Sequence, residues 1–282
     1  MSLHVVEKSC VGKRGPSGPC EDVIVRTATH AAAIDGATPR APFRLPHATA
    51  EELAARAIGR AVTGLDPMAD IDRFHHAIME AFSTCPDLAA YRQLSQERDE
   101  NADRPAASLA VWSAPRRELW QLGDVQALVD GVLMRRETAI DHIKGQIRAC
   151  HLEAALAQGV SLDDVRGPDT DPGWNAIRRE LALQDALFLN GPLDCPLAFG
   201  AADGRAGSRA WLTATSHPGA HEIVLASDGY PTLYGTLQES EAHLAALPER
   251  DLLLFREVQD CKECYPGQTS FDDRAYLWVI MT

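Results

Sequence analysis

The acidic residues with the most chemical promise stand where strand-like apolar stretches begin or end. Asp-Gly is foremost a turn dipeptide, so any one of these places is typical of a solvated turn. Together, however, they indicate carboxylates that converge at one edge of a sheet. In chain order the places are Glu21-Asp22, Asp35-Gly36, Gly123-Asp124, Asp228-Gly229 and Asp272-Asp273.

Carboxylates gathered in this way repel one another unless cations neutralise them. Hard divalent ions take oxygen ligands, and Mg²⁺ usually keeps several waters beside one or two carboxylates. Two such ions about 3.5–4 Å apart can clamp a phosphoryl group and lower the pKa of a bridging water. The pattern therefore favours a divalent metal centre that hydrolyses a phosphate ester.

The composition sets the limits within which such a centre has to be built. The chain has 282 residues and a formal net charge of −13, which is long enough for a full core and too acidic for a typical nucleic-acid surface. No apolar run is long enough to span a membrane and no signal-peptide pattern opens the chain, so a cytoplasmic protein is expected. Seven cysteines at irregular spacing fit a reduced chain, and the Cys261/Cys264 pair, which has no second pair for a zinc ribbon, is expected to be a structural or incidental feature of a loop.

The elements that would position the acids follow from hydrophobic periodicity and capping signals. Residues 1–20 are rich in Gly, Pro and Ser and suggest a loose lead-in. Thr49 with Glu52 forms a capping box at the start of a helix, and Asp70 can cap the next one. The runs of strands and helices are segregated, which indicates an α+β layered domain. Strands are expected over 23–25, 31–34, 108–112, 118–122, 125–129, 210–215, 222–226 and 276–281, and helices over 49–65, 70–82, 137–158, 174–189, 238–247 and 250–258.

The ordered acid motifs resemble those of the metal-dependent phosphatases of the PPM family, the type-2C serine/threonine phosphatases. The resemblance runs from about residue 20 to the C-terminus. It implies a four-layer α-β-β-α sandwich with two central antiparallel sheets, in a single domain over 21–282 with a flap-like helical insertion at about 135–215. The motifs that carry it are Cys20-Glu21-Asp22, Ile34-Asp35-Gly36, Leu122-Gly123-Asp124, Ser227-Asp228-Gly229 and Phe271-Asp272-Asp273.

The same resemblance implies roles for these residues around two Mn²⁺ or Mg²⁺ ions. Asp35 would bridge both ions, and Asp22 would orient a metal-bound water, so these two are the expected catalytic residues. The other expected ligands are Glu21 for one ion, the Gly36 carbonyl beside Asp35, Asp228 and Asp272 for the second ion, and Asp124 for a weaker third ion.

The chain also departs from the family pattern. Family members usually continue the first Asp-Gly with His, whereas this chain has Ala37, so a general acid would come from elsewhere, with His30, His47 and His217 as candidates by residue type. The family's phosphate-binding Arg position holds Ser17. Arg14 and Lys13, slightly upstream, could bind phosphate or belong to a solvated tail.

Three functions stay open at this stage. The first is a metal-dependent phosphohydrolase acting on a phosphoprotein or a small phosphate ester, without nucleic-acid or membrane partners. The second is a catalytically weak or inactive binding module of the same fold, which the missing His motivates. The third is a hydrolase with an N-terminal nucleophile, for which Cys10 and Cys20 are available but no processing signal is present.

Overall fold

Two five-stranded antiparallel sheets form the centre of the computed structural model, which describes residues 2–37, 45, 47–97, 104–167, 169–262, 264 and 266–282. The first sheet has the order β1-β10-β9-β6-β7 and the second the order β2-β3-β4-β5-β8. The strands of the first sheet are β1 (Leu3–Val11), β10 (Arg274–Met281), β9 (Glu222–Ala226), β6 (Gln126–Val129) and β7 (Val132–Met134). Those of the second are β2 (Val23–Arg26), β3 (His30–Ala37), β4 (Ala106–Ser113), β5 (Glu118–Leu122) and β8 (Thr213–Ser216).

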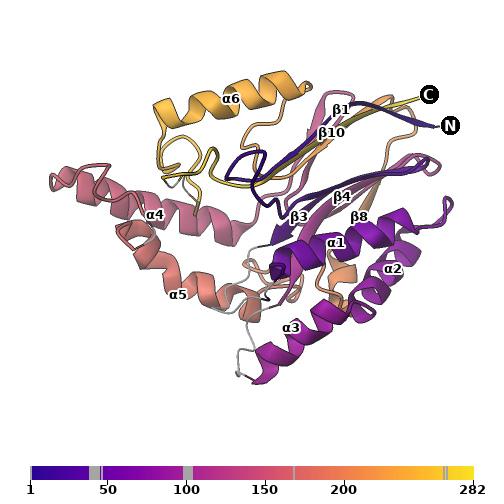
Figure 1. The fold of residues 1–282 in the computed structure, drawn as a ribbon, viewed down its shortest axis with the longest axis horizontal. Helices are drawn as coiled ribbons and strands as arrows, with labels where there is room; N and C mark the ends of the chain where they lie inside the picture. The colour runs from indigo at the N-terminus through magenta and orange to yellow at the C-terminus, as the bar shows by residue number, and fades with distance from the viewer. Residues whose placement is uncertain are drawn as a thin grey trace.

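Helices cover the outer face of each sheet, as Figure 1 shows. On the second sheet lie α1 (Ala50–Thr63), α2 (Ile71–Ser83) and α3 (Pro86–Glu97), together with the short 3-10 helix η1 (Ala206–Ala210). On the first sheet lies α6 (Leu237–Arg250). The helices α4 (Ala139–Ala157) and α5 (Pro172–Leu187) pack against each other beside one end of the sheets. The predicted α+β sandwich of helix, sheet, sheet and helix layers is confirmed by this arrangement.

Three apolar clusters fill the spaces between the layers. In β3, Ala32 and Ile34 face α1, whereas Ala31 and Ala33 face the other sheet. A third cluster lies between the first sheet and α6 and includes Tyr230. Because successive side chains of a strand point to opposite faces and both faces are buried here, β3 has a continuous apolar run rather than an alternating pattern.

The predicted loose lead-in over 1–20 is wrong for its first half. Residues Leu3–Val11 form β1, which pairs antiparallel with β10 at the other end of the chain. Along this edge strand exposed positions alternate with half-buried ones after the buried Leu3, and polar residues such as His4 and Lys8 occupy exposed positions. The strand therefore lacks the apolar run by which the others are found.

The predicted helix over 250–258 is also wrong. The helix α6 ends at Arg250, and the following residues form turns around the Asp251 carboxylate, which accepts hydrogen bonds from the backbone N–H groups of Phe255, Arg256 and Glu257. A side chain that satisfies several backbone donors gives the chain an alternative to helix. Three further differences are smaller: the sequence signals predict neither α3 nor β7, and β8 begins at Thr213 rather than at residue 210.

The capping signals at the first two helices are confirmed. The Thr49 hydroxyl accepts from the backbone N–H of Glu52, and the Asp70 carboxylate accepts from that of Arg73. Among the described residues, no helix is both long enough and apolar enough to cross a membrane.

Candidate active site

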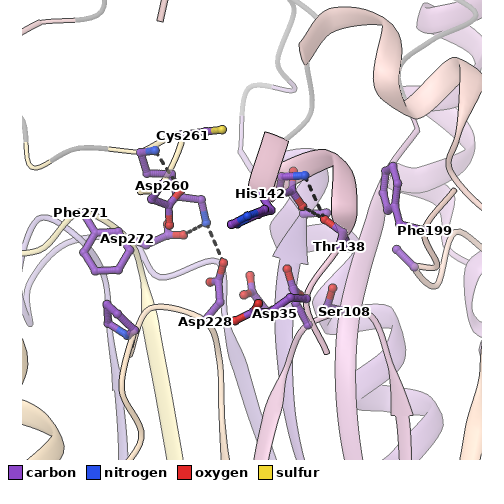
Figure 2. A pocket seen from close by; sticks show the side chains of 18 of the residues that line it. Asp35, Ser108, Thr138, His142, Phe199, Asp228, Asp260, Cys261, Phe271 and Asp272 are labelled. Atoms are coloured by element: carbon purple, nitrogen blue, oxygen red, sulfur yellow. Dashed lines mark hydrogen bonds and ion pairs between the residues drawn. The ribbon is translucent and has the colours of Figure 1, made fainter. Parts of the chain in front are cut away.

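A pocket of about 440 Å³ opens at the end of the two sheets, between the strand ends and the beginning of α4. Asp35 and Gly36 reach it from β3, Asp124 from the turn after β5, Asp228 from the end of β9, and Asp272 from the residues before β10. Figure 2 shows the labelled Asp35, Asp228 and Asp272 side chains on one side of this pocket. The structure thus brings five of the residues singled out in the sequence to a common cavity.

Asp35 and Asp228 come from different sheets and influence each other's ionisation. Burial raises the pKa of Asp35 well above its ordinary value, and the charges of Asp22 and Asp228 add to this. Burial also acts to raise the pKa of Asp228, but the charge of Lys262 and the neighbouring Asp35 carboxyl bring it below its ordinary value. The Oδ1 atom of Asp228 is buried and has no hydrogen-bond partner among the described residues.

The glycines of these two Asp-Gly pairs allow close packing, inside a strand at Gly36 and in a turn at Gly229. Gly36 lies inside β3, and a Cβ there would come within 2.9 Å of the Glu51 backbone at the start of α1. A Cβ on Gly229 would lie 2.0 Å from the Asp273 carbonyl oxygen. Neither glycine is among those with positive φ. The turn expected from the Asp-Gly dipeptide is therefore present at Asp228-Gly229 and absent at Asp35-Gly36, and both glycines let neighbouring elements approach the acids closely.

Asp124 follows a glycine that, unlike Gly36 and Gly229, has a positive φ. Gly123 has a φ of +83°, and a Cβ on it would collide with the Ser108 side chain. Burial, together with the charge of Asp228, raises the pKa of Asp124 to about 6.

Two lysines face the acids. Lys262 Nζ donates to Asp228 Oδ2 at 3.2 Å and also to Asp272 Oδ2, and the dashed lines that end on these two acids in Figure 2 mark the contacts. Lys13 Nζ lies 3.8 Å from Glu21 and 3.8 Å from Asp272. Burial alone would lower the pKa of Lys262, but Asp228 and Asp272 raise it well above its ordinary value, so the amine is positively charged.

The remaining predicted residues lie behind or outside the pocket. Asp22 is 5% exposed and accepts a hydrogen bond from the Ser227 hydroxyl at 2.7 Å, and Glu21 pairs with Lys13. Neither is among the residues that line the pocket, and neither is Arg14, which is exposed. The second acid of the Asp272-Asp273 pair has a structural role, since Asp273 accepts hydrogen bonds from the backbone N–H groups of Lys13 and Glu21, both at 2.7 Å.

The three histidines named as candidate general acids also lie away from the pocket. His30 is fully buried at the beginning of β3 beside Trp120, His47 pairs with Asp87, and His217 lies against Trp112. The pocket is lined instead by His142 of α4, whose labelled ring is directed into it in Figure 2.

The residues missed in the sequence come mainly from two places, the beginning of α4 and the segment 251–262. The segment is fastened to α4 by Arg148, which donates to the carbonyl oxygens of Leu253 and Asp260, both at 2.8 Å, and pairs with Asp171 at 2.8 Å. A Cβ on Gly145 would lie 1.9 Å from the Gln259 carbonyl oxygen, so the backbones of α4 and of the segment 251–262 are in direct contact there. The signal for Lys262 was faint but present, because it is the only basic residue between Arg256 and Arg274.

The cysteines add no cross-link to the site. All seven are free thiols. Cys261 lines the pocket, and burial raises its pKa to about 11. Cys10 lies inside β1, so processing to expose it as a nucleophile would remove most of that strand.

The acids fit one hard cation better than two. Among the described residues, no group of three or more His, Cys, Asp and Glu side chains is arranged to hold a metal ion. Mg²⁺ needs only one or two carboxylates when waters complete its shell, and Asp35 with Asp228, whose Oδ1 has no partner in the described part of the chain, supplies two. The Asp228–Asp272 pair is different, because Lys262 Nζ contacts both of these acids.

In comparisons with known proteins, no family model matches the sequence and no curated protein is similar to it. Solved structures of bacterial phosphatases are similar to the chain along its whole length. The serine/threonine phosphatase PstP/Ppp of Mycobacterium tuberculosis is 16% identical with a TM-score of 0.45, over 100% of this chain and 99% of that one. PppA, a regulatory component of the type VI secretion system in Pseudomonas aeruginosa, is 12% identical with a TM-score of 0.46, over 99% and 98%. Stp1, a serine/threonine phosphatase of Staphylococcus aureus, is 11% identical with a TM-score of 0.42, over 100% and 98%. With TM-scores below 0.5, we take from these matches only the similarity itself.

Proposed function

We propose that this protein is a metal-dependent phosphohydrolase of the type-2C kind. Its substrate would be a phosphomonoester, either phosphoserine or phosphothreonine in a protein or a small phosphate ester. The observation that carries the proposal is the meeting of Asp35 and Asp228 in one pocket, with a buried Asp228 oxygen that lacks a partner among the described residues. Half-buried acids that repel one another form an arrangement that can bind a hard cation.

Asp35 and Asp228 would hold a Mn²⁺ or Mg²⁺ ion, with the Gly36 carbonyl and Asp124 beside them. Such an ion, when bound, lowers the pKa of a bound water and draws charge from a phosphoryl oxygen. Glu21 and Asp22, which lie behind the pocket, would act by supporting Lys13 and the end of β9 rather than by touching substrate.

Basic side chains at the pocket offer a place for the phosphate. Arg135 and Arg136 line the pocket, and an Arg presents a fork of donors that matches phosphate oxygens. They therefore replace Arg14 as the phosphate-binding candidates. His142, directed into the same pocket, would protonate the leaving oxygen in the role for which the sequence offered no residue after Gly36.

The test is phosphate release from p-nitrophenyl phosphate by protein stripped with EDTA and then supplied with Mn²⁺. Asp35→Asn, which keeps the shape of the side chain, should reduce metal-dependent release to the blank. Asp130→Asn is the matched control, because Asp130-Gly131 is an Asp-Gly pair whose exposed Asp lies in the β6–β7 turn. Undiminished release by folded Asp35→Asn would refute the assignment.

A binding or regulatory module of the same fold is the second candidate. The contacts of Lys262 with Asp228 and Asp272 favour it, because they reduce the room for a second metal ion. Calorimetry with Mn²⁺ separates the two candidates, since the module predicts no metal binding below millimolar concentration.

A further inference from the structure

The Lys262 ammonium group is bound by two acids whose positions are set by the first sheet. Asp228 follows β9 and Asp272 precedes β10, and these strands are antiparallel neighbours in register from Tyr276 opposite Ala226. Lys262 Nζ donates to the Oδ2 atoms of both acids. The pair that the family resemblance assigns to a metal ion thus already has a cation between its members.

The segment that carries Lys262 is anchored at several points. Arg148 is fully buried and binds the carbonyl oxygens of Leu253 and Asp260, and Asp251 closes the turn before them. The carboxylate of Asp260 accepts a hydrogen bond from the backbone N–H of Lys262 at 3.0 Å. These contacts fix the backbone of Lys262 beside the pocket, so the ion pairs are built into the fold.

The side chain of Lys262, in contrast to its backbone, has room to move away from the two acids. It is 35% exposed and lines the pocket, and lysine carries its charge on a flexible four-carbon stem. A divalent ion at Asp228 and Asp272 would meet the ammonium group at the distance of a direct contact, where like charges repel strongly. One cation therefore excludes the other from this pair of acids.

We propose that Lys262 is a built-in cation that competes with a divalent metal ion for Asp228 and Asp272. The chain then binds one metal ion readily at Asp35 and Asp228, and a second only when Lys262 is displaced. This inference rests on the proposed function, because it presupposes a metal ion at Asp35. It replaces the symmetrical two-metal centre expected from the resemblance with one metal ion and one ammonium group.

The test is a calorimetric Mn²⁺ titration of the full chain after EDTA treatment. Wild type should bind one ion, and Lys262→Gln should bind a second ion or bind Mn²⁺ about tenfold tighter or more, since a neighbouring positive charge is removed. Lys262→Arg keeps the charge and should titrate like wild type. Lys8→Gln removes an exposed lysine of β1 and should also be unchanged. Lys262→Met, neutral and of similar length, repeats the measurement if Lys262→Gln does not fold.

The competition is overturned if the neutral variants titrate like wild type, if Lys262→Arg binds as tightly as Lys262→Gln, or if wild type binds two ions with equal affinity. Phosphate release by wild type at saturating Mn²⁺ reports separately on the proposed function. Tighter metal binding by Lys262→Gln without any turnover by wild type would support the competition and contradict the phosphohydrolase.

Discussion

Arg148 and Lys262 bring positive charge to acidic partners in two different ways. Arg148 is fully buried and pairs with the carboxylate of the equally buried Asp171, and its Nη1 donates to the backbone carbonyl oxygens of Leu253 and Asp260. Lys262 faces Asp228 and Asp272 directly and feels the charges of Asp260 and Asp35 as well. The first centre is balanced in charge, and the second has more acid than cation.

This difference in charge balance distinguishes the structural centre around Arg148 from the candidate binding centre around Lys262. A buried charge whose partners are complete holds elements together and has nothing further to bind. A half-buried group with more acids than cations keeps acid pKa values raised, as burial and the charges of neighbouring acids do at Asp35 and Asp124, and this cost is reduced when a further cation enters. The contacts of Arg148 are the means by which α4 holds the segment 251–262, and therefore Lys262, at the second centre.

Breaking the balanced centre should have the largest effect. Arg148→Met leaves Asp171 buried without its charged partner and removes the donor to the carbonyl oxygens of Leu253 and Asp260. We therefore expect the free energy of unfolding to fall by about 3–5 kcal/mol. Urea unfolding followed by circular dichroism measures this. Arg256→Met is the control, because Arg256 joins the same segment to Glu153 of α4 through an exposed ion pair, and exposed ion pairs contribute little to stability. Equal losses in both variants would show that burial and charge balance do not distinguish these two pairs.

Weakening the contact between α4 and the segment 251–262 should lower the free energy of unfolding by a smaller amount. Gly145→Ala places a Cβ 1.9 Å from the Gln259 carbonyl oxygen, and the backbone has to move. We expect a net loss of about 1–3 kcal/mol, although alanine favours helix by about 1 kcal/mol. Limited proteolysis should then cut within 251–262 first. Gly219→Ala, where a Cβ meets nothing within 4 Å, should leave stability within about 0.5 kcal/mol of wild type. A Gly145→Ala protein as stable and as resistant to protease as wild type would show that the close contact at Gly145 does not hold the segment 251–262 against α4.

The layers and the acids at the strand ends could be predicted because their signals are local. The apolar run before Asp35 and the cap at Thr49 each lie within a few residues of what they specify. The segment 251–262 could not be predicted, because its shape depends on Arg148, which lies 105 residues before the Leu253 carbonyl oxygen it binds. The same holds for β1, whose partner β10 is at the other end of the chain. The expected metal ligands come from the acid motifs, and a pattern of acids gives no sign that Lys262 lies among them.

The smallest effect should come from reducing the excess of acid without touching either cation. Asp260 belongs to both centres, since its carbonyl oxygen binds Arg148 and its carboxylate lies near Lys262. Burial, opposed by Lys262 and reinforced by Asp228 and Asp272, raises the pKa of Asp260 to about 6. In the unfolded chain the pKa is about 3.9, so between these values the folded protein binds more protons, and stability falls as the pH rises through that range.

Asp260→Asn keeps the carbonyl oxygen and an acceptor for the Lys262 N–H but carries no charge. At pH 8 the variant should therefore be more stable than wild type by about 1 kcal/mol. This is less than the ~3 kcal/mol that the full shift would give, because the side chain is partly exposed and solvent screens its charge. The difference should shrink as the pH falls below 6 and be small at pH 4, where Asp260 is protonated in the folded state and about half protonated in the unfolded chain. Urea unfolding of EDTA-treated wild type and variant at pH 4, 6 and 8 measures it, and saturating Mn²⁺ should reduce the gain at pH 8, because a bound cation removes the same excess of negative charge. A variant that is less stable than wild type at pH 8 would show that the acids around Lys262 are already balanced, and the contrast with Arg148 would fail.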